Sequence, residues 1–289
     1  MHGQTTFLNW NKERIALERI KSLDPIAHGY MDTPYYVAYS GGKDSDVLRI
    51  LFELSGVKYD LVHNHTTVDA PETVHYVRSI PGVIISKPEI TMWDLIVKKR
   101  MPPTRIVRYC CTELKERGGQ DRFVATGVRW AESVGRKAKR NSLEIISPRM
   151  KDKIVLNADN DESRRMFETC SLQGKRVLNP IIDWTDDDVW EFLRYYGCRS
   201  NPLYGCGFKR IGCIGCPMAQ DHERLRVFGR YPQYRAIYIH AFNRMLAARR
   251  ADGLPTDWQT EQQVFDWWVH STRRRREVED QIRLSEVAI

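Results

Sequence analysis

The chain has 289 residues, of which 42% are hydrophobic and 28% charged, ordinary proportions for a globular protein with a sizeable core. No run of about 18 apolar residues occurs, and residues 1–12 lack the apolar centre of a signal peptide, so we expect a cytoplasmic protein without a transmembrane helix. The net charge of +8 favours an anionic partner such as a nucleotide or a nucleic acid. Seven cysteines in a cytoplasmic chain favour metal binding or catalysis over disulfides.

The first half of the chain alternates between strand and helix patterns. Apolar spacing over residues 1–30 predicts an amphipathic helical segment, which Pro25 ends. An apolar run up to Ala38 predicts a strand, and the helix pattern after the next turn runs to about Leu54, where Gly56 closes it. Further strands are expected at 59–67 and 82–85, and further helices at 71–80, at 93–99 and from Tyr109.

The second half continues this alternation around a long insertion. An apolar strand begins at Phe123, and residues 135–175 are a polar and basic insertion with a weak strand at 154–156. Thr185 and Asp188 make a capping box for a helix that runs to Tyr196. From about residue 220 onward the pattern is helical and amphipathic.

Strand–helix alternation of this kind predicts an α/β fold with a doubly wound, mostly parallel sheet and helices on both faces, followed by a C-terminal helical extension. We expect three regions. They are an N-terminal helical segment at 1–30, the α/β domain at 31–218, and a helical region at 219–289 whose basic tail includes Arg273 to Arg276.

The turn after the first strand has the chemistry of a phosphate-binding loop. Adjacent glycines bring backbone N–H groups close to an anion at a helix N-terminus, where two hydroxyls and an ammonium surround it. The spacing differs from the Gly-x4-Gly-Lys-[Ser/Thr] loop, so a different phosphate loop is predicted. Its residues are Ser40, Gly41, Gly42, Lys43, Asp44 and Ser45. Gly127 and Arg129 follow another strand, and ligands sit at the carboxyl ends of such strands, so both groups are expected to face one nucleotide.

The cysteines favour a metal site. Cys213 and Cys216 bound a Gly-rich Cys-x2-Cys-Pro turn, and further thiolates from distant segments predict a 4Fe–4S cluster, with zinc as the alternative and a redox dithiol as a third reading. Cys111 completes the firmest three ligands, and the fourth is Cys110 or Cys206. Cys170 and Cys198 carry no motif.

Several stretches together resemble the phosphoadenosine phosphosulfate reductase family of the ATP pyrophosphatase superfamily. They are Ser40 to Ser45, Thr66 to Glu72, Cys110-Cys111 with Lys115, Thr126 to Arg129, Asn179 to Thr185, Asp188 to Trp190, Asn201 to Tyr204 and Gly212 to Cys216. The resemblance implies an adenine nucleotide alpha hydrolase-like fold that binds ATP with Mg²⁺. The pairing of Cys-Cys with Cys-x2-Cys is similar to that of cluster-bearing adenylyl-sulfate reductases.

One departure separates the chain from those reductases. They attack sulfate with a cysteine near the C-terminus, whereas no cysteine follows Cys216 here, so reductase chemistry is not expected. The loop, the run at 111–115 and the cluster turn are also similar to the ATP pyrophosphatase subunit of DNA phosphorothioation systems. This branch implies an adenylating enzyme with a DNA acceptor and a cysteine desulfurase or other sulfur donor. A sulfonucleotide reductase and a non-catalytic nucleotide-binding regulator are the alternatives.

The resemblance also implies roles for individual residues. Lys43 and Arg129 stabilise charge that develops on the phosphates, and Asp44 holds Mg²⁺ or orients the loop. Asp69 and Glu72 are placed over the ribose or the metal, with solvation as an equal reading for Glu72. Arg136 is expected to guard the acceptor.

Overall fold

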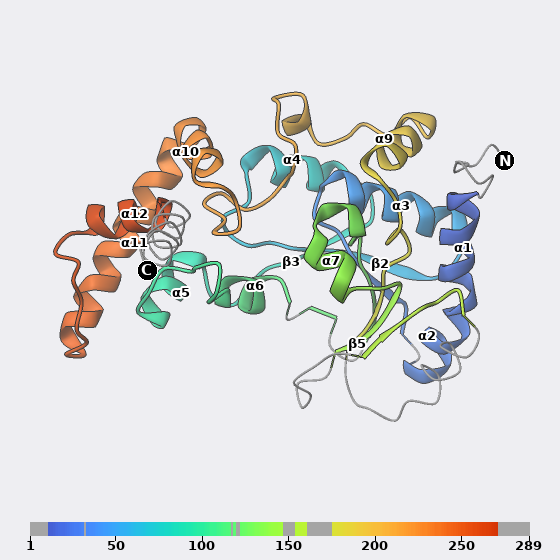
Figure 1. Cartoon of the computed structure of the whole chain (residues 1–289), viewed down its shortest axis with the longest axis horizontal. Helices are drawn as coiled ribbons and strands as arrows, with labels where there is room; N and C mark the ends of the chain where they lie inside the picture. The colour runs from blue at the N-terminus through green and yellow to red at the C-terminus, as the bar shows by residue number, and fades with distance from the viewer. Residues whose placement is uncertain are drawn as a thin grey trace, which may run out of the picture. The chain divides into compact units, whose positions relative to one another are not determined.

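The computed structural model describes residues 11–31, 33–116, 118–119, 122–146, 154–160 and 175–270 (Figure 1). Within these ranges the strands are β1 Tyr35–Ala38, β2 Tyr59–Asn64, β3 Val83–Ser86, β4 Phe123–Ala125, β5 Leu143–Ile146, β6 Ile154–Leu156 and β7 Lys175–Leu178. The α-helices are α1 Lys12–Ser22, α2 Asp24–Met31, α3 Lys43–Ser55, α4 Pro71–Ser79, α5 Met92–Lys99, α6 Tyr109–Leu114, α7 Val134–Lys139, α9 Asp186–Tyr195, α10 Asp221–Arg230, α11 Pro232–Ala251 and α12 Glu261–Val269. Two short 3-10 helices are η1 Trp130–Glu132 and η2 Pro202–Tyr204.

The strands of the described residues form one mostly parallel sheet of seven in the order β3-β2-β1-β4-β7-β5-β6. The five strands from β3 to β7 in this order are parallel to their neighbours, while β5 is antiparallel to β7 and β6 is antiparallel to β5. Long crossovers between parallel strands require helices to cover the sheet. The predicted doubly wound α/β fold and its helical C-terminal part are confirmed.

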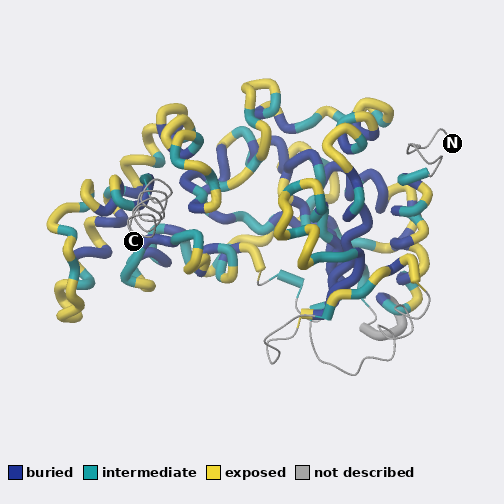
Figure 2. The backbone as a smooth tube through the Cα atoms, in the orientation of Figure 1, coloured by how far each residue is buried: buried dark blue, intermediate teal, exposed yellow. Residues whose placement is uncertain are grey.

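Side chains of the central strands alternate between two cores. Tyr35 and Val37 of β1 enter the main hydrophobic core, whereas Tyr36 joins a smaller cluster with Val62 and Val124. This alternation follows from the two-residue period of a strand. Because both faces of the sheet are buried, consecutive residues of these strands are apolar. Figure 2 shows buried backbone, in dark blue, concentrated around the sheet, and β1 and β4 are buried along most of their length.

Local capping chemistry sets several helix boundaries as predicted. Gly56 ends α3 with φ of 71°, a left-handed conformation that glycine adopts without strain. The Thr185 side chain accepts a hydrogen bond from Asp188 N and starts α9. The N-terminal helical segment differs in detail, because α1 ends at Ser22 and Pro25 lies in the first turn of α2, where its missing N–H has no cost.

The insertion is more regular than its polar sequence predicts. The weak strand at 154–156 is present as β6, but β5 and β7 were not expected. Glu144 interrupts the apolar pattern of β5 and is nevertheless fully buried, since Arg140 and Asn179 donate hydrogen bonds to its carboxylate. The remaining insertion residues, 147–153 and 161–174, and the tail from 271 lie outside the described residues, and so do Cys170 and the Arg273–Arg276 run.

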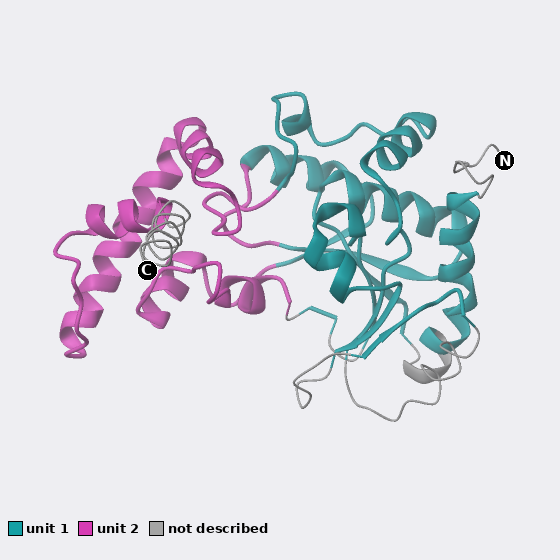
Figure 3. Cartoon of the chain, viewed as in Figure 1, with its two compact units in different colours: residues 1–64, 71–86, 117–211 teal, residues 65–70, 87–116, 212–289 magenta. Residues whose placement is uncertain are grey.

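Packing divides the chain into two compact units (Figure 3). Unit 1 comprises Met1–Asn64, Pro71–Ser86 and Arg117–Ile211, and unit 2 comprises His65–Ala70, Lys87–Glu116 and Gly212–Ile289. Unit 1 contains the sheet, and unit 2 contains α5, α6 and α10 to α12. The predicted region boundaries at 30 and 218 stay a prediction.

Among the described residues, no helix combines the length and the apolarity needed to span a membrane.

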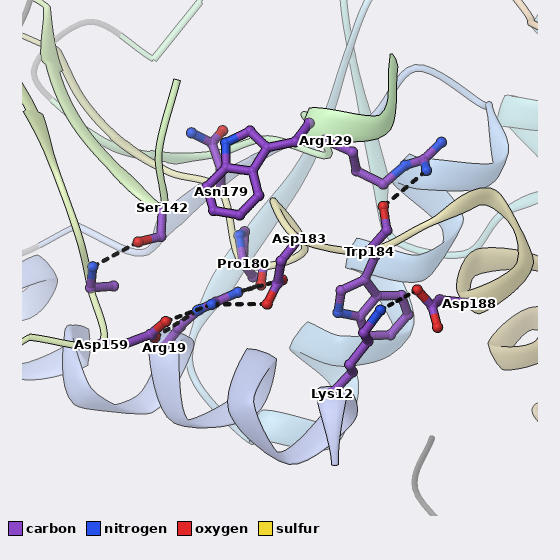
Figure 4. Close-up of polar contacts among 12 residues, drawn as sticks. Lys12, Arg19, Arg129, Ser142, Asp159, Asn179, Pro180, Asp183, Trp184 and Asp188 are labelled. Atoms are coloured by element: carbon purple, nitrogen blue, oxygen red, sulfur yellow. Dashed lines mark hydrogen bonds and ion pairs between the residues drawn. The ribbon is translucent and has the colours of Figure 1, made fainter. Parts of the chain in front are cut away.

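A buried arginine ties α1 to the segment after β7 within unit 1. The Arg19 side chain is 5% exposed, and its guanidinium donates to the carboxylates of Asp159 and Asp183 and to the carbonyl of Pro180 at 2.6–2.8 Å for the closest atoms (Figure 4). A desolvated guanidinium requires such partners, so this cluster fixes where the segment enters α9.

Replacement of Arg19 by methionine is therefore expected to lower the free energy of unfolding by about 1–3 kcal/mol, below the range for a fully buried pair because both carboxylates are partly exposed. Urea denaturation measures the loss. Arg14→Met on the same helix removes an exposed pair with Glu18 and is the matched control, with an expected change of at most about 0.5 kcal/mol. Equal losses in the two variants would contradict the structural role of Arg19.

Candidate functional site

The predicted phosphate loop is a tight turn between β1 and α3 in unit 1. Gly41 has φ of 72°, and a Cβ there would lie 2.8 Å from Val77 Cγ2, so both conformation and space require glycine. Gly42 is the N-cap of α3, where the Ser45 hydroxyl accepts from Gly42 N at 3.1 Å and donates to Gly42 O at 2.7 Å. The Ser40 hydroxyl donates to Ser45 Oγ at 3.3 Å. The loop therefore keeps its shape through its own hydrogen bonds.

Two cations from distant segments converge on this loop. The ammonium of Lys43 lies 2.6 Å from Asp186 Oδ1 and 3.6 Å from Asp44 Oδ1. The guanidinium of Arg129 donates to Asp44 Oδ1 and to Asp186 Oδ1, each at 2.7 Å. It also donates to the carbonyl of Trp184 at 3.2 Å (Figure 4). Lys43 and Arg129 are buried, so their charges act in a medium that screens them weakly.

Neighbouring segments of unit 1 hold the loop from outside. A Cβ on Gly127 would lie 3.0 Å from the carbonyl oxygen of Asp44, so glycine allows the segment after β4 to approach the loop backbone. Asn201 donates to the carbonyl of Gly41 at 3.0 Å. The hydroxyl of Tyr204 accepts from Lys43 N at 2.8 Å.

Further positive charge surrounds the same region. Burial, with repulsion from Arg210 and Arg140 and a smaller effect of Arg129, lowers the pKa of Arg136 to about 10. Arg136 pairs with Glu132, which also accepts from Arg129 N. Burial is the largest cause of this lowered pKa, and the neighbouring arginines add positive charge that favours an anion.

A second site lies in unit 2, where four cysteines line one cavity of about 40 Å³. Two come from the start of α6 and two from the Cys-x2-Cys turn, and Met92, Leu114, Ile214 and Tyr238 supply apolar walls. The four are Cys110, Cys111, Cys213 and Cys216. The structure thus brings the Cys-Cys and Cys-x2-Cys motifs together.

The cysteine turn is held in place by backbone contacts and by aromatic packing. Ile214 donates to the carbonyl of Val68 at 2.8 Å, and its own carbonyl accepts from the Tyr238 hydroxyl at 2.9 Å. Arg105 donates to the carbonyls of Pro217 and Met218. These contacts fix the direction of the turn independently of any ligand.

Polar neighbours act on the thiols themselves. The Thr66 hydroxyl lies 3.5 Å from Cys213 Sγ. Burial raises the pKa of the Cys213 thiol while Lys115 opposes this effect, and Cys213 in turn raises the pKa of Lys115. A hydrogen bond from Cys110 lowers the pKa of Cys111. The hydroxyl and the ammonium thus offset part of the burial that disfavours the thiolate of Cys213, the form that binds metals, while its pKa stays above the ordinary value.

The other predicted site residues lie as follows. Cys206 is exposed, belongs to unit 1 and does not line the cysteine cavity. Asp69 is buried in unit 2, where its carboxylate accepts from Thr66 N at 2.7 Å and lies 3.1 Å from His65 Nδ1. Glu72 is half-buried in the first turn of α4 in unit 1. The nucleotide contacts of Asp69 and Glu72 stay predictions.

Sequence reasoning missed several residues of both sites. Asp186 directly follows the predicted cap Thr185 and has no predicted role in the site, yet it bridges Lys43 and Arg129. Tyr204 and Thr66 lay in recognised motifs without a role. The signal for Asp186 was weak, because three consecutive aspartates at a helix N-terminus are already explained by the helix dipole.

The comparisons agree with the fold and with the motifs. A family model for the phosphoadenosine phosphosulfate reductase domain matches residues 34–219. An uncharacterised 37.8 kDa protein of Escherichia phage 186 is 29% identical over 164 residues, which are 55% of this chain and 43% of that protein. Adenosine 5'-phosphosulfate reductase of Oceanobacillus iheyensis is 25% identical over 207 residues, 66% of this chain and 74% of that enzyme. The chain spans about half the length of several curated relatives that it matches.

Among solved structures, the U34-tRNA thiolase of Methanococcus maripaludis with its [4Fe-4S] cluster aligns with a TM-score of 0.41 and 13% identity, over 87% of this chain and 84% of that chain. A likeness this distant carries no argument about the site.

The turn between the cysteines provides a test of the second site. A Cβ on Gly215 would lie 2.7 Å from Trp268 Cη2 and 2.9 Å from Phe228 Cζ, and its φ is 73°. Gly215→Ala is expected to lower the free energy of unfolding by about 2–4 kcal/mol through backbone strain and overpacking. Gly253→Ala has a similar φ of 66° but no atom within 4 Å of its Cβ, and it is expected to cost only about 1 kcal/mol. Urea denaturation, followed by tryptophan fluorescence, measures the free energy of unfolding of both variants. Equal decreases would show that glycine is required at 215 only for its positive φ and not for the space beside the rings.

Proposed function

Because the chain belongs to the phosphoadenosine phosphosulfate reductase domain family, we propose that it is an ATP pyrophosphatase that adenylates an acceptor in a sulfur-transfer pathway. The observation that carries the proposal is the convergence of two buried cations, Lys43 and Arg129, on a glycine loop at the N-terminus of α3. The loop sequence, which resembles that of ATP pyrophosphatases, supports the same assignment.

The charges of the loop region suit a triphosphate. Lys43 and Arg129 are the direct cations, and Arg136 belongs to a second group of arginines whose mutual repulsion a polyanion would relieve. Helix α3 adds the positive end of its dipole at the same place. Asp44 lies beside both cations and is the loop's own candidate for a Mg²⁺ ligand or for orienting Arg129.

The proposed reaction is a substitution at the α-phosphorus of ATP. An acceptor oxygen forms a bond to that phosphorus, the bond to the oxygen bridging the α- and β-phosphates breaks, and pyrophosphate leaves with the electron pair. Lys43 and Arg129 stabilise the negative charge that develops on the phosphates, and burial of both strengthens this effect. The product is an adenylated acceptor, which is open to attack by sulfur.

Cys110, Cys111, Cys213 and Cys216 line one cavity, and these four thiols would together hold a metal group there. Four thiolates bind either a 4Fe–4S cluster or a zinc ion, and we propose the cluster, with Cys110 rather than Cys206 as the fourth ligand. The apolar walls support this choice, since iron–sulfur clusters are tuned by burial and by hydrogen bonds to sulfur. A cluster of this kind would supply a place to hold sulfur during transfer.

The acceptor is proposed to be DNA, in a phosphorothioation pathway with a cysteine desulfurase or another protein as sulfur donor. The net charge of +8 and the arginines near the loop support a nucleic-acid acceptor. The alternative function is reduction of an adenylated sulfate, which the similarity to the Oceanobacillus iheyensis reductase favours.

The first test measures pyrophosphate released from ATP in the presence of DNA. We expect release by the wild type and a loss of at least about 100-fold in Lys43→Met, because the variant lacks a cation at the developing charge. Lys58→Met, which changes an exposed lysine of the same unit, is the control and should retain the wild-type rate. Sulfite release from adenylyl sulfate without pyrophosphate release from ATP would instead support the reductase.

The second test measures the metal after anaerobic purification. Four-thiolate ligation predicts bound iron and acid-labile sulfide with a brown absorption, lost in Cys110→Ala and kept in Cys206→Ala. Tight zinc without iron in the wild type would contradict the cluster. Loss of iron in Cys206→Ala but not in Cys110→Ala would contradict the ligand set.

A further inference from the structure

One oxygen of Asp186 lies between the two cations of the loop. Asp186 Oδ1 accepts from Lys43 Nζ at 2.6 Å and from Arg129 Nη2 at 2.7 Å. The backbone N–H of Lys43 is also engaged, because it donates to the Tyr204 hydroxyl at 2.8 Å. Three donors that face the proposed phosphate site are thus satisfied by oxygens of the chain itself, as buried donors require.

The three charged partners differ sharply in exposure. The side chains of Lys43 and Arg129 are 9% and 2% exposed, whereas that of Asp186 is 68% exposed. Because Asp186 is exposed, a change of its side-chain rotamer can move its carboxylate away from the two cations and into water. The free-energy cost of this movement is small. The buried cations have no such alternative, so Asp186 is the member of the cluster that moves.

Arg129 does not depend on Asp186 for its orientation. Its Nε donates to Asp44 at 2.7 Å and its Nη1 donates to the carbonyl of Trp184 at 3.2 Å, which leaves Nη2 for Asp186. When the Asp186 carboxylate moves away, the guanidinium of Arg129 therefore keeps its orientation, and its Nη2 can donate to a ligand.

We propose that the Asp186 carboxylate is a placeholder: it occupies the position of a nucleotide phosphate, and that phosphate displaces it when a nucleotide binds to the loop. This inference rests on the proposed function and adds a residue that sets the affinity of the site. A tethered carboxylate competes at high effective concentration, so weakly charged anions such as chloride are rejected and a polyphosphate is selected. In the ligand-free chain it also shields two buried cations that would otherwise repel each other.

The test compares Asp186→Asn with Asp187→Asn, which removes the same charge from the adjacent exposed position of α9. Isothermal titration with inorganic pyrophosphate, and with an ATP analogue whose α–β bridging oxygen is carbon, measures affinity without turnover. The Asp186→Asn variant is expected to bind both probes about threefold to tenfold more tightly than the wild type, because the competing carboxylate is gone. Asp187→Asn is expected to stay within about twofold of the wild type, since a neighbouring exposed charge is largely screened.

The inference and the proposed function fail in different ways. Asp186→Asn binding no tighter than the wild type, or more weakly, would show that Asp186 positions the cations, and it would overturn the placeholder alone. A wild type that binds the ATP analogue but releases no pyrophosphate from ATP would overturn the proposed function alone. Absence of binding in all three proteins would overturn both.

Discussion

The buried guanidinium of Arg129 is the constraint on which the glycine loop and the segments around it depend. A guanidinium removed from water needs an acceptor for each edge, and here the acceptors come from the loop helix and from the segment that leads into α9. Satisfying this one side chain therefore fixes three distant segments against one another. Arg19 does the same from the other side, through Pro180 and Asp183. The stretch from 180 to 184 is thus held between two buried arginines.

The cysteine half is held by different forces. Gly215 lies against the rings of Trp268, Phe228 and Tyr238, and the indole N–H of Trp268 is satisfied by the carbonyl of Pro103. This arrangement places the Cys-x2-Cys turn on an aromatic core, whose close packing fixes the shape of the turn.

Features that short-range chemistry decides were predictable from the sequence. The Gly-Gly turn, the left-handed Gly56 and the Thr185–Asp188 box each depend on residues a few positions apart. The strands β5 and β7 were missed because charged residues enter them, and their burial is possible only through partners that fold nearby, such as Asn179 for Glu144. Local patterns carry no information about such partners.

The same distinction explains the outcome for the candidate site. Lys43 and Arg129 were found because each stands in a motif, but the bridge that Asp186 makes between them joins positions 143 and 57 residues apart. For the fourth cysteine of the predicted site the sequence leaves Cys110 and Cys206 open, because adjacent residues such as Cys110 and Cys111 project in different directions. Only the packing of α6 against the turn brings Cys110 and not Cys206 to the cavity.

The way in which the chain is shared between the two units has a consequence for its inheritance. The backbone passes from one unit to the other five times, at 64/65, 70/71, 86/87, 116/117 and 211/212. No single cut therefore yields a fragment that contains either unit whole. The phosphate loop and the cysteine cavity therefore cannot be separated by one break in the gene that leaves both units whole.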